Sequence, residues 1–366
     1  METTPAQLAP AVALGAFALA FVFGAVGAKT NFCTMGAVSD WVNMGDSSRM
    51  RMWLLAIGVA VLGSNALQLA GIVDLSKSIY PGPNFTWLSY LAGGFLFGVG
   101  MTLASGCGSK TLIRIGGGNL KSVVVFIVAG IAAYMTLRGI LGAFRAGVLE
   151  QAAVTLSTGQ DLPSLVGGST AARVVLALLV GGGLVAYAYS SKDFRANFDY
   201  TLGGVVTGLV VVGGWYVSGR IGYLAEDPNT LQEAFVATNS GRMESFSFVA
   251  PLAYTLDYLM LWTDKSKIIT YGIASTAGVI LGSLAWALWS KSFRWEGFRD
   301  AEDTGMHMVG GFLMGFGGIC ALGCTIGQGI SGFSTLALGS IITFVAIVAG
   351  SAAAMKWQYW RMDREG

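Results

Sequence analysis

Charged residues are scarce in this sequence. Asp, Glu, Lys and Arg make up 11% of its 366 residues, whereas a soluble domain carries about 25% because its surface faces water. Hydrophobic residues make up 54% of the chain, and the mean hydropathy is +0.64. The sequence lacks the charge that a water-facing surface of this size needs. Soluble globular and disordered classes are therefore excluded, and an all-α integral membrane protein in a lipid bilayer is predicted.

Groups that usually carry catalysis or hold cofactors are also rare. The single histidine, His307, excludes a bis-His haem or a His-rich metal site within this chain. The sequence has no Gly-Lys-Ser/Thr phosphate loop, no Cys-x-x-Cys pair and no recognisable catalytic triad. The net charge is +2 without a basic tail, which gives no indication of nucleic-acid binding. We expect no cofactor, no metal, no nucleic-acid partner and no enzymatic activity.

Nine apolar stretches are long enough to cross a bilayer as helices, which takes about 20 residues each. They are residues 8–28, 50–73, 86–105, 120–143, 170–190, 200–219, 267–290, 305–322 and 334–355. The chain has 53 glycines, a residue that membrane helices use where their backbones approach closely. The sequence predicts about nine transmembrane helices.

Basic residues predict the orientation of these spans, because Lys and Arg are enriched on the cytoplasmic side. With an outer N-terminus, the inner side holds 14 of the 22 basic residues: Lys29, Arg49, Arg51, Lys110, Arg114, Lys121, Lys192, Arg195, Lys291, Arg294, Arg299, Lys356, Arg361 and Arg364. We expect the N-terminus outside and the C-terminus in the cytoplasm. Residues 1–10 have no positive charge before the apolar run, so we expect the first span to be retained rather than cleaved as a signal peptide.

The chain resembles itself at an offset of 217 residues. Residues 93–107 and 310–324 are identical at nine of fifteen positions, and both copies end in Gly-Cys. The copies lie in the third and eighth spans, so they run in opposite directions across the membrane. This predicts two inverted-topology repeats, residues 1–143 and 200–366, joined by a linker over residues 144–199 that contains the fifth transmembrane helix.

Two segments after the Gly-Cys motifs are too short to cross the membrane yet too apolar for ordinary loops; a third such segment lies between the first two spans, and the repeat symmetry predicts a fourth between the sixth and seventh. They are residues 31–37, 108–118, 245–251 and 325–332. We expect them to be re-entrant loops or half-helices of largely non-helical backbone that meet near the bilayer midplane, where such backbone is tolerated only inside protein or along a cavity. Three of the four segments are accompanied by a thiol, from Cys33, Cys107 or Cys324.

These thiols suggest how an anion is bound. Half-helix ends attract anions, and a thiol is a weak, polarizable hydrogen-bonding group that holds a sulfur anion loosely, as conduction requires. We predict three stations along one path, at Cys107, Cys33 and Cys324. The candidate substrate-binding set is completed by Gly106, Gly323, Asn31, Ser247 and Gln328, with Lys29 and Lys110 as weaker candidates. Cys320 is expected to serve packing, because its counterpart in the repeat is Leu103.

The sequence resembles the YeeE/YedE family of bacterial sulfur transporters. The motifs that carry the resemblance are Asn31-Phe32-Cys33-Thr34-Met35-Gly36-Ala37 with Asp40, Ser105-Gly106-Cys107, Ser245-Phe246-Ser247-Phe248 with Pro251, and Leu322-Gly323-Cys324-Thr325 with Gly327 and Gln328. The resemblance implies a nine-helix inverted-repeat fold in the bacterial inner membrane that imports thiosulfate into the cytoplasm. It also implies that three cysteines relay thiosulfate by S–H···S hydrogen bonds, and that a cytoplasmic sulfur carrier of the TusA type is a partner.

Other functions remain open at this stage. Many members of the family carry Gln-Arg where this chain has Lys29-Thr30, so the cargo of an importer could instead be a selenium compound or another sulfur anion. A membrane thiol redox or sulfur-transfer enzyme is an alternative from a different class.

Overall fold

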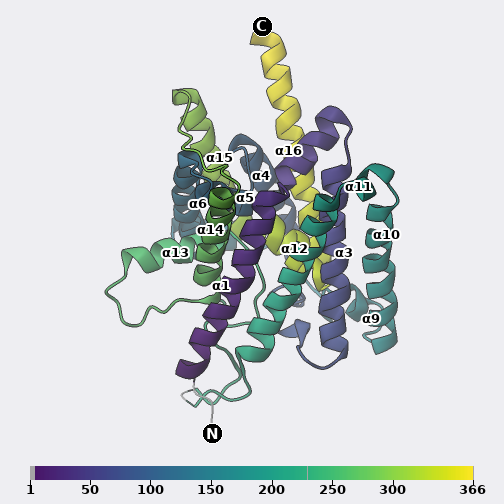
Figure 1. The fold of residues 1–366 in the computed structure, drawn as a ribbon. Helices are drawn as coiled ribbons and strands as arrows, with labels where there is room; N and C mark the ends of the chain where they lie inside the picture. Colours follow the sequence, from purple (N-terminus) through teal and green to yellow (C-terminus); the bar gives the residue numbers. More distant parts are fainter. Residues whose placement is uncertain (1–4, 229, 366) are drawn as a thin grey trace.

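The computed structural model describes residues 5–228 and 230–365, which form a bundle of helices (Figure 1). The long helices are α1 (Pro5–Lys29), α3 (Ser48–Leu69), α4 (Trp87–Leu103), α6 (Leu120–Arg138), α12 (Phe198–Tyr216), α14 (Tyr271–Trp289), α15 (Ala301–Cys320) and α16 (Leu338–Glu365). A further long element consists of α9 (Thr170–Ala177), the π-helical η4 (Leu178–Gly182) and α10 (Gly183–Tyr189).

Shorter elements connect the long helices. They are α2 (Thr34–Ser39), η1 (Asp40–Met44), η2 (Leu75–Lys77), α5 (Gly108–Gly116), α7 (Ile140–Phe144), η3 (Arg145–Leu149), α8 (Leu162–Leu165), α11 (Lys192–Ala196), η5 (Val217–Ile221), α13 (Ala250–Met260) and η6 (Gly327–Gly332). Strand β1 (Asn84–Phe85) pairs antiparallel with β2 (Val154–Thr155), and β3 (Tyr223–Leu224) pairs antiparallel with β4 (Ala234–Phe235). The all-α fold class is confirmed.

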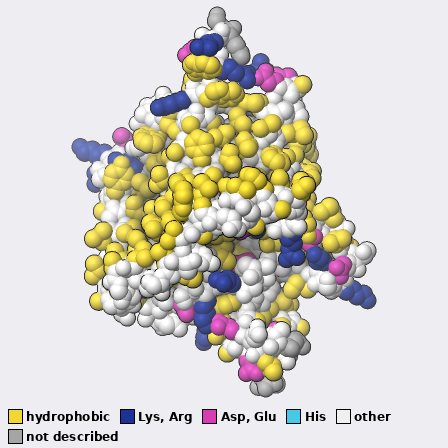
Figure 2. All heavy atoms as spheres, turned by 180° about the vertical axis from the view of Figure 1, so that it is seen from behind, with side chains coloured by type: hydrophobic (Ala, Val, Ile, Leu, Met, Phe, Trp, Pro, Cys, Tyr) yellow, Lys and Arg dark blue, Asp and Glu magenta, His cyan; other side chains and the backbone are white. Residues whose placement is uncertain are grey.

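Within the described residues, eight helical stretches are long and apolar enough to cross a membrane. The ninth expected span, residues 305–322, coincides with α15. This helix has a comparable length but is more polar, because Glu302, Asp303 and His307 lie in its first two turns. It nevertheless packs against both α4 and α6 inside the bundle. Seen from behind, hydrophobic side chains cover the middle of the molecule and charged ones gather mainly toward its two ends (Figure 2).

The long helices pack in matching pairs. Helix α4 contacts α15 and α16, and α15 in turn contacts α4 and α6; similarly, α1 packs on α14 and α3 packs on α12. Glycine allows these close approaches, since packing of small residues replaces the hydrophobic effect as the force that joins helices in lipid. A Cβ atom added to Gly100 would lie 2.7 Å from the carbonyl oxygen of Gly310, and one added to Gly310 would lie 2.6 Å from the carbonyl oxygen of Gly100.

The element formed by α9, η4 and α10 lies at one edge of the bundle, beside α3 (Figure 1). Arg173 of α9 anchors it, because its guanidinium donates to Asp161 Oδ2 at 3.1 Å and to Asn65 Oδ1 at 3.3 Å. Both acceptors are buried.

Helix α16 extends past the rest of the bundle. It has 28 residues, which corresponds to about 42 Å at 1.5 Å per residue, whereas the hydrocarbon core of a bilayer is about 30 Å thick. Its C-terminal turns project beyond the other helices (Figure 1), and the side chains of its last residues are mostly exposed.

Candidate transport pathway

Three cysteines occupy the same local structure. Cys33, Cys107 and Cys324 each lie between the end of a long helix and the start of a short one. In each case the residue two positions earlier has left-handed backbone, at φ 52° for Asn31, 55° for Ser105 and 59° for Leu322. The N–H group that follows donates to the carbonyl five residues back, at 2.7 to 3.1 Å. This hydrogen-bond pattern closes a helix with a left-handed residue, so the preceding helix ends just before the thiol.

The same cysteines begin the helices that follow. The carbonyl groups of Cys33, Cys107 and Cys324 accept the first helical hydrogen bond, from residues four positions later, at 3.0, 2.9 and 2.7 Å. The thiol of Cys33 also accepts a hydrogen bond from the N–H of Gly36 at 3.4 Å, and that of Cys324 accepts one from Gly327 at 3.4 Å. Cysteine therefore takes the position at which Ser, Thr, Asp or Asn usually caps a helix.

The three thiols converge inside the protein. Cys33 is 4% exposed, and Cys107 and Cys324 are fully buried. The Thr34 hydroxyl, directly after Cys33, contacts the Cys107 sulfur at 4.0 Å. On its other side Cys107 approaches Cys324 through Phe248, whose N–H donates to the Cys324 sulfur at 3.2 Å and whose carbonyl oxygen would lie 2.5 Å from a Cβ atom on Gly108. Cys107 therefore neighbours both of the other thiols.

The fourth segment completes this convergence without a thiol. Residues 245–249 have no regular secondary structure, and α13 begins at Ala250. The backbone N–H of Phe248 donates to the Cys324 sulfur at 3.2 Å, and the Ser247 hydroxyl lies 4.0 Å from the same atom. The Ser331 hydroxyl donates to the carbonyl of Phe246 at 2.7 Å, so this segment is fastened to the helix that follows Cys324.

Two of the four segments are more helical than expected. Residues 108–118 and 325–332 were predicted to have largely non-helical backbone, but the first forms α5 and the second lies in a continuous helical segment that contains η6. A helix satisfies its own N–H and C=O groups, which removes the cost of placing irregular backbone away from water. The half-helix alternative of the prediction describes these segments correctly.

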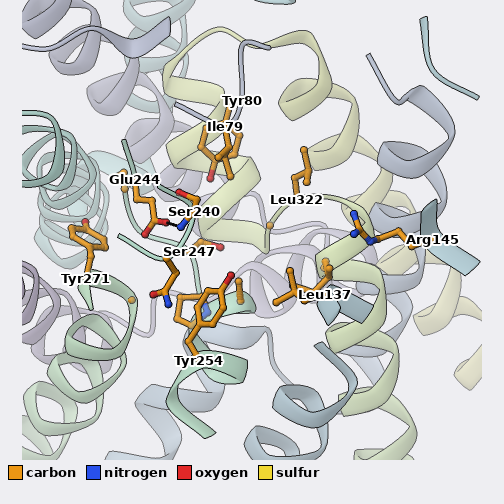
Figure 3. Close-up of a pocket in the computed structure, with 18 residues that line it drawn as sticks. Ile79, Tyr80, Leu137, Arg145, Ser240, Glu244, Ser247, Tyr254, Tyr271 and Leu322 are labelled. Carbon is orange, nitrogen blue, oxygen red and sulfur yellow. Dashed lines mark hydrogen bonds between the residues drawn. The ribbon is translucent and has the colours of Figure 1, made fainter. Parts of the chain in front are cut away.

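A cavity of about 220 Å³ lies next to the thiols, and Ile79, Tyr80 and Ser240 are among the residues that line it (Figure 3). Gly323, Leu322 and Ser247 line its inner part, next to Cys324. Glu244 and Arg145 stand on opposite sides of it (Figure 3). Arg145 is paired with Glu150, so this guanidinium is already neutralised.

Glu244 is a carboxyl group in an unusual setting. Burial raises its pKa, and this effect outweighs the hydrogen bonds that favour the ionised form, including one from the Ser240 N–H at 2.8 Å. Three tyrosine rings also line the cavity, from Tyr80, Tyr254 and Tyr271. The cavity is therefore mostly apolar and aromatic, with one carboxyl group whose charge is disfavoured.

The opposite side of the thiols is basic. Lys110 donates to Asn31 Oδ1 at 3.4 Å, so these two predicted site residues lie together beside Cys33. Lys110 and Arg114 also line a second cavity of about 500 Å³, together with Lys291 and Arg294. Cationic side chains thus surround the end of the thiol series at which Cys33 lies.

The remaining predicted site residues are divided. Gly106 and Gly323 precede two of the thiols, and a Cβ atom on them would lie 3.3 Å from Lys110 and 3.2 Å from Gln328. The Gln328 amide nitrogen donates to the Ala321 carbonyl, which leaves its amide oxygen buried and without a partner among the described residues. Lys29 forms an ion pair with Asp199 at 3.5 Å and lines a third cavity together with Asn31 and Arg49.

Cys320 does not belong to the thiol group. It lies in the contact between α15 and α4, where a Cβ atom added to Gly93 would lie 2.9 Å from the Cβ atom of Cys320. The Ser89 hydroxyl donates to its carbonyl at 2.8 Å. All four cysteines are free and buried, and the described residues contain no group of three or more His, Cys, Asp or Glu side chains placed to hold a metal ion.

The sequence matches the family model described as Sulphur transport over residues 29–353. The chain belongs to this family. The resemblance to YeeE/YedE transporters is thereby confirmed, and the chain is a sulfur transporter that spans a membrane several times, not an enzyme. It is 26% identical over 362 residues to the thiosulfate transporter TsuA of Escherichia coli strain K12, with 94% of each chain covered. It is 24% identical over 352 residues to TsuA of Spirochaeta thermophila, covering 93% of this chain and 97% of the relative.

Several residues that line the cavities or lie beside the thiols of this sulfur transporter have no role in the sequence-based candidate set. Arg145 and Glu244 reach the cavity from connecting segments, and no sequence pattern marks them. Thr34 and Thr325 each directly follow a thiol; this Cys-Thr pair, which occurs twice, is the signal that could have identified them.

Proposed function

We propose that the protein imports thiosulfate across the bacterial inner membrane into the cytoplasm. The observation that carries the proposal is the convergence of the three buried thiols between an apolar cavity and a basic one. Both relatives named above are thiosulfate transporters and align over nearly the whole chain, which supports the choice of cargo. Cationic groups at the Cys33 end favour release of an anion on that side.

The thiols pass thiosulfate along by weak S–H···S hydrogen bonds, in the order Cys324, Cys107, Cys33. Buried sulfur is polarizable and a poor hydrogen-bonding group, so each contact is weak enough to be exchanged for the next. The central place of Cys107 supports this order, because contacts through Thr34 connect it to Cys33 and contacts through Phe248 connect it to Cys324. No thiol needs to change its oxidation state.

The same path defines an orientation. The cavity that reaches Cys324 opens to the periplasm, and the basic cavity near Lys110 opens to the cytoplasm, with the N-terminus outside and the C-terminus inside. The excess of Lys and Arg on the inner side supports this arrangement. A cytoplasmic sulfur carrier of the TusA type would then take up thiosulfate at the basic cavity.

Two inverted repeats, residues 1–143 and 200–366, generate the path, with residues 144–199 as the linker. The paired contacts support this, since α1 on α14 corresponds to α12 on α3, and α4 on α16 corresponds to α15 on α6. The reciprocal approach of Gly100 and Gly310 fits the same relation. Opposed half-helices from the two repeats then meet at the thiols.

Uptake of radiolabelled thiosulfate into cells without other importers tests this function. Cys107→Ala should abolish uptake, because it removes the station that both other thiols neighbour. Cys320→Ala is the matched control and should retain wild-type uptake, since that thiol only packs between helices. Membrane abundance of each variant is measured by immunoblot. Full uptake by Cys107→Ala, or equal loss in both variants, would contradict the relay.

Two further measurements separate the alternatives. Competition by selenite and sulfite during uptake shows whether a selenium compound or another sulfur anion is the preferred cargo. Mass spectrometry of the protein during transport shows whether Cys324 acquires a persulfide, which a sulfur-transfer enzyme requires and a hydrogen-bonded relay does not.

A further inference from the structure

Three hydroxyl groups surround the central thiol. The Thr34 hydroxyl donates to the Cys107 sulfur at 4.0 Å, and the Ser109 hydroxyl lies 3.4 Å from it. Thr325 belongs to the other half of the chain and directly follows Cys324, whose sulfur accepts a hydrogen bond from the Phe248 N–H at 3.2 Å. The carbonyl of the same Phe248 lies against Gly108, next to Cys107, where a Cβ atom would be 2.5 Å away. All three hydroxyl-bearing residues are at most 1% exposed. Cys107 therefore lies inside a small ring of buried hydroxyls.

Thr325 is the member of the ring that points to a ligand. Its hydroxyl oxygen is buried and has no hydrogen bond of ordinary geometry to any described residue. A threonine inside a helix often satisfies its hydroxyl on the carbonyl four residues earlier, but Thr325 is the first residue of its helix and has no such carbonyl within it. The nearby Ala321 carbonyl accepts from the Gln328 side chain instead. A buried hydroxyl without a partner is costly and calls for an explanation.

A hydroxyl-bearing residue directly follows a thiol of the pathway wherever the backbone leaves room for its side chain. Thr34 and Thr325 directly follow Cys33 and Cys324 at the start of their helices. Gly108 holds the corresponding position after Cys107, where a Cβ atom would lie 2.5 Å from the carbonyl oxygen of Phe248. A side chain does not fit there, and Ser109, one residue later, supplies the hydroxyl instead.

Thiosulfate has two kinds of surface, a large soft terminal sulfur and three oxygens that share the remaining charge. Hydroxyl groups are good donors to such oxygens, whereas thiols are weak ones. We propose that Thr34, Ser109 and Thr325 bind the oxygens of the passing anion while Cys107 contacts its terminal sulfur. The ring then selects sulfur anions that carry oxygen, and it does so with neutral groups that release the anion more readily than a cation would. This inference rests on the proposed function and adds a selectivity site to it.

Three variants of the full-length protein test the ring through the KM for thiosulfate uptake. Thr325→Val removes the hydroxyl at nearly constant shape and should raise KM about tenfold, as expected for one hydrogen bond to a charged group. Thr325→Ser keeps the hydroxyl and should stay within about threefold of wild type on the same scale. Thr343→Val is the matched control, because Thr343 also has a buried hydroxyl without a partner among the described residues, and its KM should be unchanged.

Competition by sulfite, which has the three oxygens but no terminal sulfur, tests the chemistry of the contact. Sulfite should inhibit thiosulfate uptake by the wild type, and its inhibition constant should rise in Thr325→Val and be restored in Thr325→Ser. A wild type that is insensitive to sulfite, a Thr325→Val variant with unchanged KM, or an equal effect of Thr343→Val overturns the inference. If Cys107→Ala abolishes uptake while Thr325→Val leaves it intact, only the hydroxyl ring fails. If Cys107→Ala transports normally, the proposed function fails.

Discussion

Ser105 and Leu322, which lie 217 residues apart, both have left-handed backbone and each stands two residues before a thiol of the pathway. Left-handed backbone is strained for residues other than glycine, by about 1–2 kcal/mol. The chain accepts this strain at two equivalent positions, where it ends one helix and starts the next within four residues. The thiol at each position is thereby fixed by the backbone.

Substitution of Ser105 should reveal that strain. Ser105→Gly is expected to change the free energy of unfolding by less than about 1 kcal/mol, because relief of strain offsets the added freedom of the unfolded chain. Ser105→Val should lower it by about 2 kcal/mol, since a β-branched residue tolerates positive φ poorly. Thermal unfolding of the two variants in detergent measures the difference. Equal stability of both variants would show that the left-handed turn is unstrained.

The close approach of α4 and α15 at Gly100 and Gly310 gives a second prediction. Gly100→Val should prevent α4 and α15 from approaching, because its Cβ atom alone would lie 2.7 Å from a carbonyl oxygen, and we expect little folded protein in the membrane fraction. Gly305→Val is the control, since a Cβ atom at Gly305 meets nothing within 4 Å. Size-exclusion chromatography in detergent compares the two. A monodisperse Gly100→Val protein at wild-type yield would contradict the packing.

Asp40 and Arg49 hold the first half-helix in place. The two side chains form a bidentate ion pair, and Asp40 is only 5% exposed. Asp40→Asn should lower the free energy of unfolding by roughly 1–3 kcal/mol, because Arg49 loses a charged acceptor, and should reduce uptake through movement of α2. Glu233→Gln, in the more exposed pair with Lys77, should change stability by about 0.5 kcal/mol or less. Chemical unfolding of both variants provides the comparison, and similar losses would refute the assignment.

Glu244 predicts a dependence of uptake on pH. Because burial raises the pKa of Glu244, this carboxyl takes up a proton at a higher pH than an exposed one, and its charge is lost earlier as the medium is acidified. The neutral form no longer repels an incoming anion, so uptake should rise as pH falls. Glu244→Gln should transport faster at neutral pH and lose this part of the pH profile. The exposed Glu226, changed to Gln, should leave the profile unchanged; a Glu244→Gln profile identical to wild type would exclude a role in uptake.

The sequence was sufficient for the membrane fold because hydropathy depends on composition over long windows. The predicted first span, residues 8–28, corresponds to α1 (Pro5–Lys29), and the predicted third, residues 86–105, to α4 (Trp87–Leu103). The candidate thiols could also be identified from the sequence, because the Gly-Cys ending of the repeat occurs in it twice. The bounds of α15 agree within a few residues despite its polar start.

Other features depend on contacts between distant segments. Arg145 and Glu244 line opposite sides of one cavity, although 98 residues lie between them in the sequence. No sequence pattern near either residue predicts that the other lies in the same cavity. The left-handed backbone at Leu322 could not be predicted from the sequence either, because leucine seldom adopts this conformation. Lys29 was a candidate for the pathway because it closely precedes Cys33 in the sequence. Its ammonium group forms an ion pair with Asp199 of α12, which the sequence did not indicate.

The projecting end of α16 has a practical consequence. Because its last turns are mostly exposed and touch α15 through the Arg361–Glu302 ion pair, an epitope or protease site appended there is reachable without disturbing the bundle. Digestion of intact spheroplasts and of inside-out vesicles would then report on which face of the membrane this end lies, and so fix the sidedness of both cavities in one measurement.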